Sequence, residues 1–185
     1  MKHISGGNGF AVAPTRRQMI ARSAIALGSL GTGLKLQVSD EQQSMAQAAS
    51  TTESKTRTSL HQEVALMAPP PRIYEILLDS RQFAVFTGLS AEIEPKPGGA
   101  FVMFGGLIEG RNIELVLSER IVQAWRPTAW APGTYSLVRF QLKPDRSNCT
   151  VTLDHSSFPE GLYDHLSSGW AERYWEPLKK YLART

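Results

Sequence analysis

Large apolar residues recur at every fourth position near the end of the 185-residue chain: Leu162, Leu166, Trp170, Tyr174, Leu178 and Leu182. This spacing drifts slowly around one side of an α-helix, and Trp175 and Tyr181 widen the stripe. We therefore expect a long helix from about Glu160 to Ala183, with a kink at Pro177 and a close approach to a neighbouring layer at Gly169. Burial of each large side chain contributes about 1.5–3 kcal/mol, so this helix should dominate the stability of the domain.

Short strand-like segments separated by turn signals precede this helix: Ser59–Met67, Ala91–Glu94, Ala100–Phe104, 113–117, Arg120–Arg126, Tyr135–Lys143 and Cys149–Ser156. Pro97-Gly98-Gly99, Gly105-Gly106 and Pro132-Gly133 mark turns between them. Such spacing indicates an antiparallel meander. A sheet that curls around a single helix gives an α+β domain with two layers and one core.

Two short helices are expected after the first strand. Pro69–Pro71 can open a helix, because a proline at the first helical position loses no intrahelical hydrogen bond, and an apolar face follows it. Asp79 and Ser80 are good caps for a second helix that holds Phe83 and Phe86.

The first 48 residues are typical of an export signal. The segment Thr15–Ile20 resembles the twin-arginine motif, with Arg16 and Arg17 as the arginine pair. A short, glycine-rich apolar run follows, and Ala46-Gln47-Ala48 offers a small-x-small cleavage site. We expect a signal peptide over 1–48, a polar linker over 49–58 and one domain over 59–185. The twin-arginine translocase would then be a partner, and the mature protein would be periplasmic or extracellular, or cytoplasmic if the signal fails.

Charge and composition restrict the function classes. Five basic and two acidic residues precede Ala49, whereas the remaining 15 basic and 15 acidic residues cancel. A nucleic-acid-binding module would keep a basic face, so no nucleic-acid partner is expected. No apolar run approaches the roughly 20 residues of a membrane span. With Cys149 alone, no internal disulfide can form.

Few residues are suited to catalysis. His61, His155 and His165 have no metal-ligand spacing, and we find neither a phosphate-binding loop nor a nucleophile elbow, so no metal or cofactor is expected. Asp154 and His155 are neighbours on a strand and must face opposite sides. His155 on the inward face is either a hydrogen-bonded histidine at the core margin or an acid/base group.

Several segments resemble one known family: Pro97–Phe101, Glu119–Arg126, Trp130–Gly133, Gly169-Trp170 and Tyr174–Leu182. They resemble the C-terminal domain of the activator of Hsp90 ATPase, within the START-like (SRPBCC), Bet v 1-like superfamily. The resemblance covers about residues 59–184. It implies the helix-grip fold, in which a seven-stranded antiparallel sheet grips the C-terminal helix and two short helices follow the first strand.

The resemblance also implies a cleft between sheet and helix, because other branches of the superfamily bind lipids, sterols, polyketides or plant hormones. The expected lining is mostly large and apolar: Phe83, Phe86, Phe101, Met103, Ile113, Leu115, Trp125, Val138, Phe140, His155, Trp170 and Tyr174. The alternative is that these side chains fill the interior and leave no cavity. Alternation does not decide between Phe101/Met103 and Val102/Phe104 as the inner set.

Three hypotheses follow. The first is a non-enzymatic protein that binds a small hydrophobic ligand after export. The second is an Hsp90-activator-type co-chaperone or protein-interaction module, which requires residence in the cytoplasm. The third is an enzyme such as a cyclase or hydrolase, for which the sequence offers only His155.

Overall fold

The computed structural model describes residues 56–184. The predicted signal peptide with Arg16 and Arg17, and most of the predicted linker, lie outside these residues. The described elements are, in chain order, β1 (Ser59–Leu66), α2 (Pro70–Leu78), α3 (Ser80–Thr87), β2 (Glu92–Ile93), β3 (Ala100–Met103), the 3-10 turn η1 (Phe104–Gly106), β4 (Ile108–Val116), β5 (Arg120–Pro127), β6 (Ser136–Asp145), β7 (Asn148–Ser156), α4 (Tyr163–Trp170), the π-helical turn η2 (Ala171–Trp175) and α5 (Glu176–Leu182).

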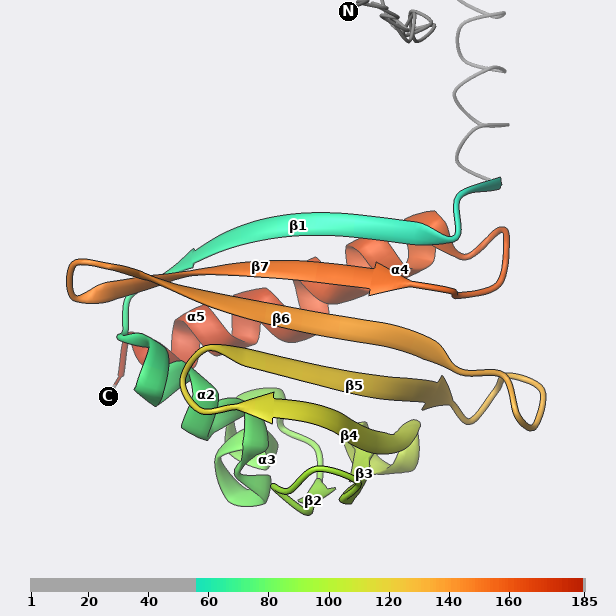
Figure 1. Ribbon diagram of the computed structural model, residues 1–185, viewed down its shortest axis with the longest axis horizontal. Helices are drawn as coiled ribbons and strands as arrows, with labels where there is room; N and C mark the ends of the chain where they lie inside the picture. The colour runs from blue at the N-terminus through green and yellow to red at the C-terminus, as the bar shows by residue number, and fades with distance from the viewer. Residues whose placement is uncertain (1–55, 185) are drawn as a thin grey trace, which may run out of the picture. The chain divides into compact units, whose positions relative to one another are not determined.

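The strands form one seven-stranded antiparallel sheet in the order β1-β7-β6-β5-β4-β3-β2. Strands β2 to β7 are a meander, and β1 closes the sheet beside β7. The C-terminal helix crosses one face of the sheet, while α2 and α3 connect β1 to β2 (Figure 1). The helix-grip fold that the sequence predicts is therefore confirmed, including the two short helices after the first strand.

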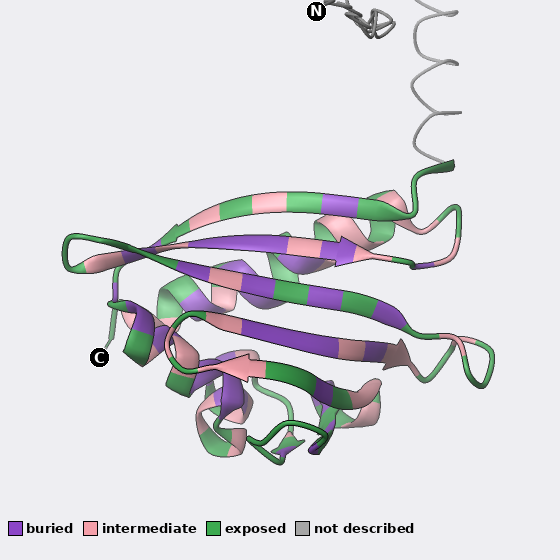
Figure 2. Ribbon diagram, viewed as in Figure 1, coloured by how far each residue is buried: buried purple, intermediate pink, exposed green. Residues whose placement is uncertain are grey.

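Period-two alternation decides which strand residues face the helix. On β6, Val138, Phe140 and Leu142 are buried and the residues between them are not (Figure 2). On β3, Phe101 and Met103 are 2% and 1% exposed, whereas Val102 is 42% exposed. Phe101 and Met103 are therefore the inward pair on this strand, which alternation alone had left open.

Gly110 permits a close approach at the centre of the sheet. It lies in register between Phe101 on β3 and Trp125 on β5. A Cβ atom at this position would overlap the carbonyl oxygen of Ala124 and the ring of Phe101. The ring of Phe101 can therefore lie over the backbone of β4 and meet Trp125 edge-on, with the ring centres 6.2 Å apart.

The two short helices begin and end as their residues predict. Pro70 stands in the first turn of α2, where its missing N–H is no loss. The Asp79 carboxylate caps α3 by accepting a hydrogen bond from the backbone N–H of Gln82 at 2.7 Å. Gly88 ends α3 at a φ of 72°, the left-handed conformation that glycine adopts without strain.

The long C-terminal helix begins at Tyr163, later than the predicted Glu160, because Gly161 adopts a φ of 82° and leaves the helical region. The disruption predicted at Pro177 takes the form of the wider π turn before it, in which the Glu176 N–H bonds to the carbonyl of Ala171. This wider turn buries the neighbouring aromatic residues Tyr174 and Trp175 together, each 3% exposed.

Gly169 does not mediate the predicted close approach. A Cβ atom at Gly169 would meet no heavy atom within 4 Å outside its own helix turn. The helix and the sheet are therefore apart at this position.

Two kinds of site are not found within residues 56–184. No helix there combines the length and the apolar character that a bilayer crossing requires, and no three His, Cys, Asp or Glu side chains there gather as a metal site.

Candidate functional site

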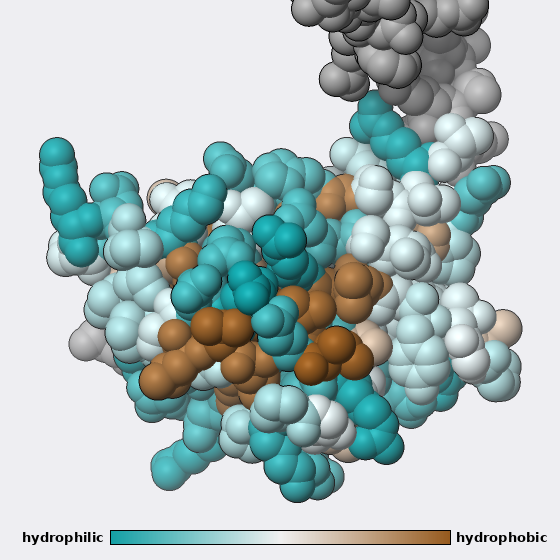
Figure 3. Space-filling model, viewed as in Figure 1, coloured by the Kyte–Doolittle hydropathy of each residue, from teal (hydrophilic) through white to brown (hydrophobic). Residues whose placement is uncertain are grey.

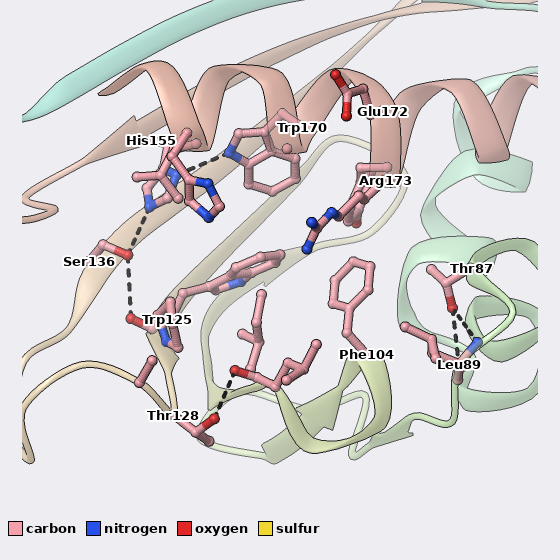
Figure 4. A pocket seen from close by; sticks show the side chains of 18 of the residues that line it. Thr87, Leu89, Phe104, Trp125, Thr128, Ser136, His155, Trp170, Glu172 and Arg173 are labelled. Carbon is pink, nitrogen blue, oxygen red and sulfur yellow. Dashed lines mark hydrogen bonds between the residues drawn. The ribbon is translucent and has the colours of Figure 1, made fainter. Parts of the chain in front are cut away.

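A cavity of about 450 Å³ lies between the first half of the C-terminal helix and the sheet. Its walls come from α4 and η2 on one side and from β5, β6 and β7 on the other, and the turn around η1 forms its third side (Figure 4). Its lining includes Thr87, Phe104, Leu107, Ile108, Trp125, Thr128, Ser136, His155, His165, Leu166, Gly169, Trp170, Glu172, Arg173, Tyr174 and Pro177.

The helix leaves this space open because of the residues on its inner face. Leu166, Gly169, Arg173 and Pro177 follow one another at helical spacing and all line the cavity. Gly169 has no side chain, and a Cβ there would be in open space. Beside the apolar stripe of Leu166, Trp170 and Tyr174, the helix therefore has no side chain at Gly169 to fill the space.

A chain of hydrogen bonds crosses the inner wall. The Trp170 indole Nε1–H donates to His155 Nδ1 at 3.1 Å. Because an indole N–H can only donate, Nδ1 is the acceptor and the proton of the neutral ring is on Nε2. Nε2–H then donates to Ser136 Oγ at 2.8 Å, and the serine hydroxyl donates to the carbonyl of Trp125 at 3.3 Å. The polar side-chain atoms of Trp170, His155 and Ser136 therefore all have hydrogen-bond partners within the protein.

His155 is therefore a neutral structural group in this geometry. It is 2% exposed, and burial lowers its pKa to about 4 because the charged imidazolium would lose its hydration. Asp154 lies on the opposite face of the sheet, where its carboxylate is 2.7 Å from His61 Nδ1. The burial and hydrogen bonds of His155 match one of the two alternatives left open by the sequence, a hydrogen-bonded histidine at the core margin.

A second hydrogen-bonded chain orients Trp125. Its indole N–H donates to Gln123 Oε1 at 2.9 Å, and Gln123 Nε2 donates to Asn112 Oδ1 at 2.8 Å. Asn112 Nδ2 completes the chain by donating to the carbonyl of Glu94 at 2.7 Å. Asn112 and Gln123 are 0% and 2% exposed, so this buried network fixes the ring of Trp125 as a wall of the cavity.

Tyr174 separates the cavity from the solid core. Its ring centre lies 4.8 Å from that of Trp170 and 5.8 Å from that of Phe140, with which it is stacked. Burial raises the pKa of the Tyr174 phenol, so the hydroxyl stays protonated. The resulting site has aromatic walls, neutral interior polar groups and one charged edge on η2.

The family model described as "Activator of Hsp90 ATPase homolog 1-like protein" matches residues 67–183. The chain belongs to this family. Curated relatives include activator of 90 kDa heat shock protein ATPase homolog 2 of Mus musculus, 27% identical over 114 residues, and the activator homolog of Dictyostelium discoideum, 26% identical over 129 residues. These matches cover 62% and 69% of this chain but only 34% of each relative, so the chain spans about a third of their length.

Solved structures agree on the fold of this activator-homolog family member. An HSP90 activator from Plasmodium falciparum superposes with a TM-score of 0.66 at 22% identity, over 69% of this chain and 97% of that chain. The Aha1 dimer from Colwellia psychrerythraea gives a TM-score of 0.57 at 18% identity, over 68% of this chain and 96% of that chain. At these identities the likeness shows the fold.

Four of the residues that the sequence predicts as lining do line the cavity of this family member: Trp125, His155, Trp170 and Tyr174. Others are buried in the solid core outside it: Phe83, Phe86, Phe101, Met103, Val138 and Phe140. Leu115 is partly buried against that core. Ile113 is 53% exposed, because the register of β4 against β5 shifts between Asn112 and Glu114 and turns its side chain outward. Ligand binding by any of these residues remains a prediction.

Phe104 and Arg173 are lining residues that the sequence prediction missed. Phe104 has a φ of 54°, a left-handed conformation that costs a non-glycine residue free energy and brings its ring inward after Met103. The two glycines that follow Phe104 were the available signal for this turn. Arg173 lies on the same helix face as Leu166, Gly169 and Pro177. The sequence did not predict this position, because a charged residue is not expected to line an apolar cavity.

Proposed function

We propose that this domain binds a small apolar molecule, without chemical conversion, in the cavity between the sheet and the C-terminal helix. The observation that carries the proposal is the cavity itself, whose volume of about 450 Å³ falls in the range of about 300–1,000 Å³ typical of ligand sites. Trp125, Trp170, Tyr174 and Phe104 supply aromatic walls on which an apolar ligand would pack.

The interior hydrogen bonding supports a binding role over catalysis. His155 and Ser136 use their polar atoms within the protein, and the low pKa of His155 keeps it neutral. Because these two residues are neutral and already hydrogen-bonded, an apolar ligand that covers them would impose no desolvation penalty on them. The strained turn at Phe104 is a further feature of binding sites, where backbone strain tends to collect.

Filling the cavity from the helix tests the proposal. We expect 1-decanol to bind the wild-type chain saturably in isothermal titration calorimetry. Gly169→Leu should abolish this binding while the protein stays folded, because the new side chain grows into open space. Gly169→Ala is the matched control and should retain most of the affinity. Absence of saturable binding by the wild type, or unchanged binding by Gly169→Leu, would overturn the proposal.

A second function is an Hsp90-activator-type interaction, favoured by the names of the relatives and by one surface feature. On the face of the sheet turned away from the helix, apolar side chains gather over β4, β5 and β6 (Figure 3). Ile113 on β4 and Leu137 on β6 are 53% and 42% exposed, and Leu117, in the turn between β4 and β5, is 80% exposed. Exposed apolar patches mark protein contacts.

Stimulation of the ATPase of purified Hsp90 tests this second function. If it holds, the full chain accelerates ATP hydrolysis, and Leu137→Ser lowers that stimulation. Val85→Ser, at an exposed position on α3, is the control and should leave stimulation unchanged. A full chain that fails to stimulate or to bind Hsp90 would remove this candidate.

We also propose that the chain is exported through the twin-arginine translocase, on the strength of Arg16, Arg17 and the features that follow them in the sequence. Cells that express the full chain should contain processed protein outside the cytoplasm. The double variant Arg16→Lys, Arg17→Lys should accumulate as unprocessed protein in the cytoplasm. Unprocessed cytoplasmic protein for both chains would contradict export and would favour the Hsp90 interaction, since a cytoplasmic Hsp90 would then be accessible.

A further inference from the structure

Arg173 carries a positive charge to the edge of an otherwise apolar cavity. It lies within η2, one helical turn from both Gly169 and Pro177, and all three line the cavity. Figure 4 shows its guanidinium group directed toward the space between Trp125, Trp170 and Phe104. The missing side chain of Gly169 leaves this approach unobstructed.

The guanidinium group of Arg173 has no hydrogen-bonding or ion-pair partner among residues 56–184. Within the part of the chain that the structure describes, no hydrogen bond or ion pair involves it, whereas Arg120 and Arg126 are paired with Glu114 and Glu109. Glu172 is the one carboxylate among the lining residues, and Figure 4 shows it pointing away from the cavity. Five N–H donors beside an apolar space are therefore available to an anion.

Most of the other lining polar groups are already used; among the described residues, the ring of His165 and the hydroxyl of Tyr174 are the lining groups besides Arg173 and Glu172 for which no hydrogen bond is found. Thr87 Oγ1 lies 2.8 Å from the carbonyl of Phe83, and Thr128 Oγ1 lies 3.3 Å from that of Leu107. The hydrogen-bonded chain through Ser136 and His155 is complete. Arg173 is the group among these that carries a permanent positive charge, so recognition of an anion falls first to Arg173, while the aromatic walls receive the apolar part of the ligand.

We propose that the occupant of the cavity is an anionic amphiphile, an apolar body that ends in a carboxylate, and that Arg173 binds the carboxylate. This inference rests on the proposed ligand-binding function and specifies its ligand class. The apolar body would pack against Trp125 and Trp170, and the carboxylate would lie at the edge, where the two oxygens match the fork of the guanidinium group.

Three ligands with the same ten-carbon chain test the inference: decanoate, 1-decanol and decyltrimethylammonium. Each is titrated calorimetrically into the full chain, at low and at moderate salt. We expect decanoate to bind about tenfold more tightly than 1-decanol, as a charge-assisted hydrogen bond allows, and decyltrimethylammonium to bind most weakly. Added salt should reduce the difference in affinity between decanoate and 1-decanol, because the edge of the cavity is open to solvent and the charges there are screened.

Two charge-matched variants assign the preference to one residue. Arg173→Gln should lose the preference for decanoate while it retains affinity for 1-decanol. Lys180→Gln makes the same change in net charge at an exposed position on the same helix and should behave as the wild type. Equal binding of decanoate and 1-decanol, or a preference that survives Arg173→Gln, would overturn the inference and leave the proposed function intact. Failure of all three ligands to bind would overturn both.

Discussion

The two halves of the C-terminal helix meet the sheet in different ways. Along α5, Leu178 is fully buried, and it belongs to the continuous core that includes Ile73 and Ile76 of α2. Along α4 and η2, Leu166 is only partly buried and Gly169 faces open space, which leaves the cavity of about 450 Å³. One amphipathic helix therefore packs against the solid core at one end and borders the cavity at the other.

This difference shows how a small domain can hold a cavity and remain stable. The cavity takes up only part of the first half, because Trp170, Tyr174 and Trp175 of α4 and η2 are buried in the same core as Leu178 of α5 and supply apolar burial that folding requires. The π turn lies at the boundary, where it buries Tyr174 and Trp175 together and keeps Arg173 on the cavity face. π turns in other proteins are frequent at functional sites.

The largest effect is expected in the filled half. Leu178→Ala should lower the free energy of unfolding by about 2–5 kcal/mol, because it leaves a void in a close-packed core. Urea denaturation followed by circular dichroism measures the loss. Leu166→Ala, on the open half, should lower the free energy of unfolding far less, because the Leu166 side chain already borders the cavity. Equal losses at the two positions would contradict the distinction between the halves.

The next effect is a loss of stability in acid that originates at the inner wall of the cavity. Burial lowers the pKa of His155 from 6.5 to about 4. As the pH falls, His155 is therefore protonated in the unfolded chain at a higher pH than in the folded chain. Stability present above pH 6.5 should therefore decline by about 3 kcal/mol on the way to pH 4.

Comparison with His155→Phe isolates this contribution. Denaturant titrations at a series of pH values should show that the stability of the variant falls less between pH 6.5 and pH 4, because the variant lacks the buried imidazole. If the two proteins lose the same stability, His155 is not buried and neutral as described.

A smaller effect concerns the hydrogen bond between helix and sheet. Trp170→Phe removes the donor to His155 Nδ1 and should cost about 1–3 kcal/mol, because the buried acceptor is left unpaired. Trp175→Phe is the matched control, since its indole N–H bonds to Gln62 in a partly buried position that water can reach. In thermal unfolding, the midpoint temperature of Trp170→Phe should be clearly lower than that of Trp175→Phe. The reverse order would contradict the role of the inner wall.

The smallest effect has the opposite sign. Gly169→Ala should stabilise the protein by about 0.5–1 kcal/mol, because alanine favours the helix and the added methyl group meets no atom within 4 Å. Gly110→Ala should destabilise it, since that methyl group would overlap Ala124 and Phe101. Differential scanning calorimetry compares the two. A destabilised Gly169→Ala would mean that helix and sheet are in contact there.

The sequence predicted the fold because its main signals are local. The four-residue spacing of the helix, the alternation in β7 and the cap at Asp79 each specify an element without knowledge of distant residues. The family resemblance then supplied the strand count and the helix-grip arrangement, which the local signals alone left incomplete.

The site was only partly predictable, because its geometry depends on exceptions to those patterns. The positive φ of Phe104 and the bulge at Ile113 reverse the faces that alternation suggests. Gly169 indicated close packing, whereas the structure has open space there, since one glycine is compatible with both. Arg173 gave no signal, because a charged residue beside an apolar stripe ordinarily faces solvent.

The four tryptophans allow one direct test of the cavity. Trp125 and Trp170 line it, whereas Trp130 and Trp175 do not. In nitrogen-15 NMR spectra of the full chain titrated with 1-decanol, we expect the indole N–H signals of Trp125 and Trp170 to shift most and to saturate together. Shifts confined to Trp130 and Trp175, or no saturable shift at any tryptophan, would contradict the account of a ligand cavity between helix and sheet.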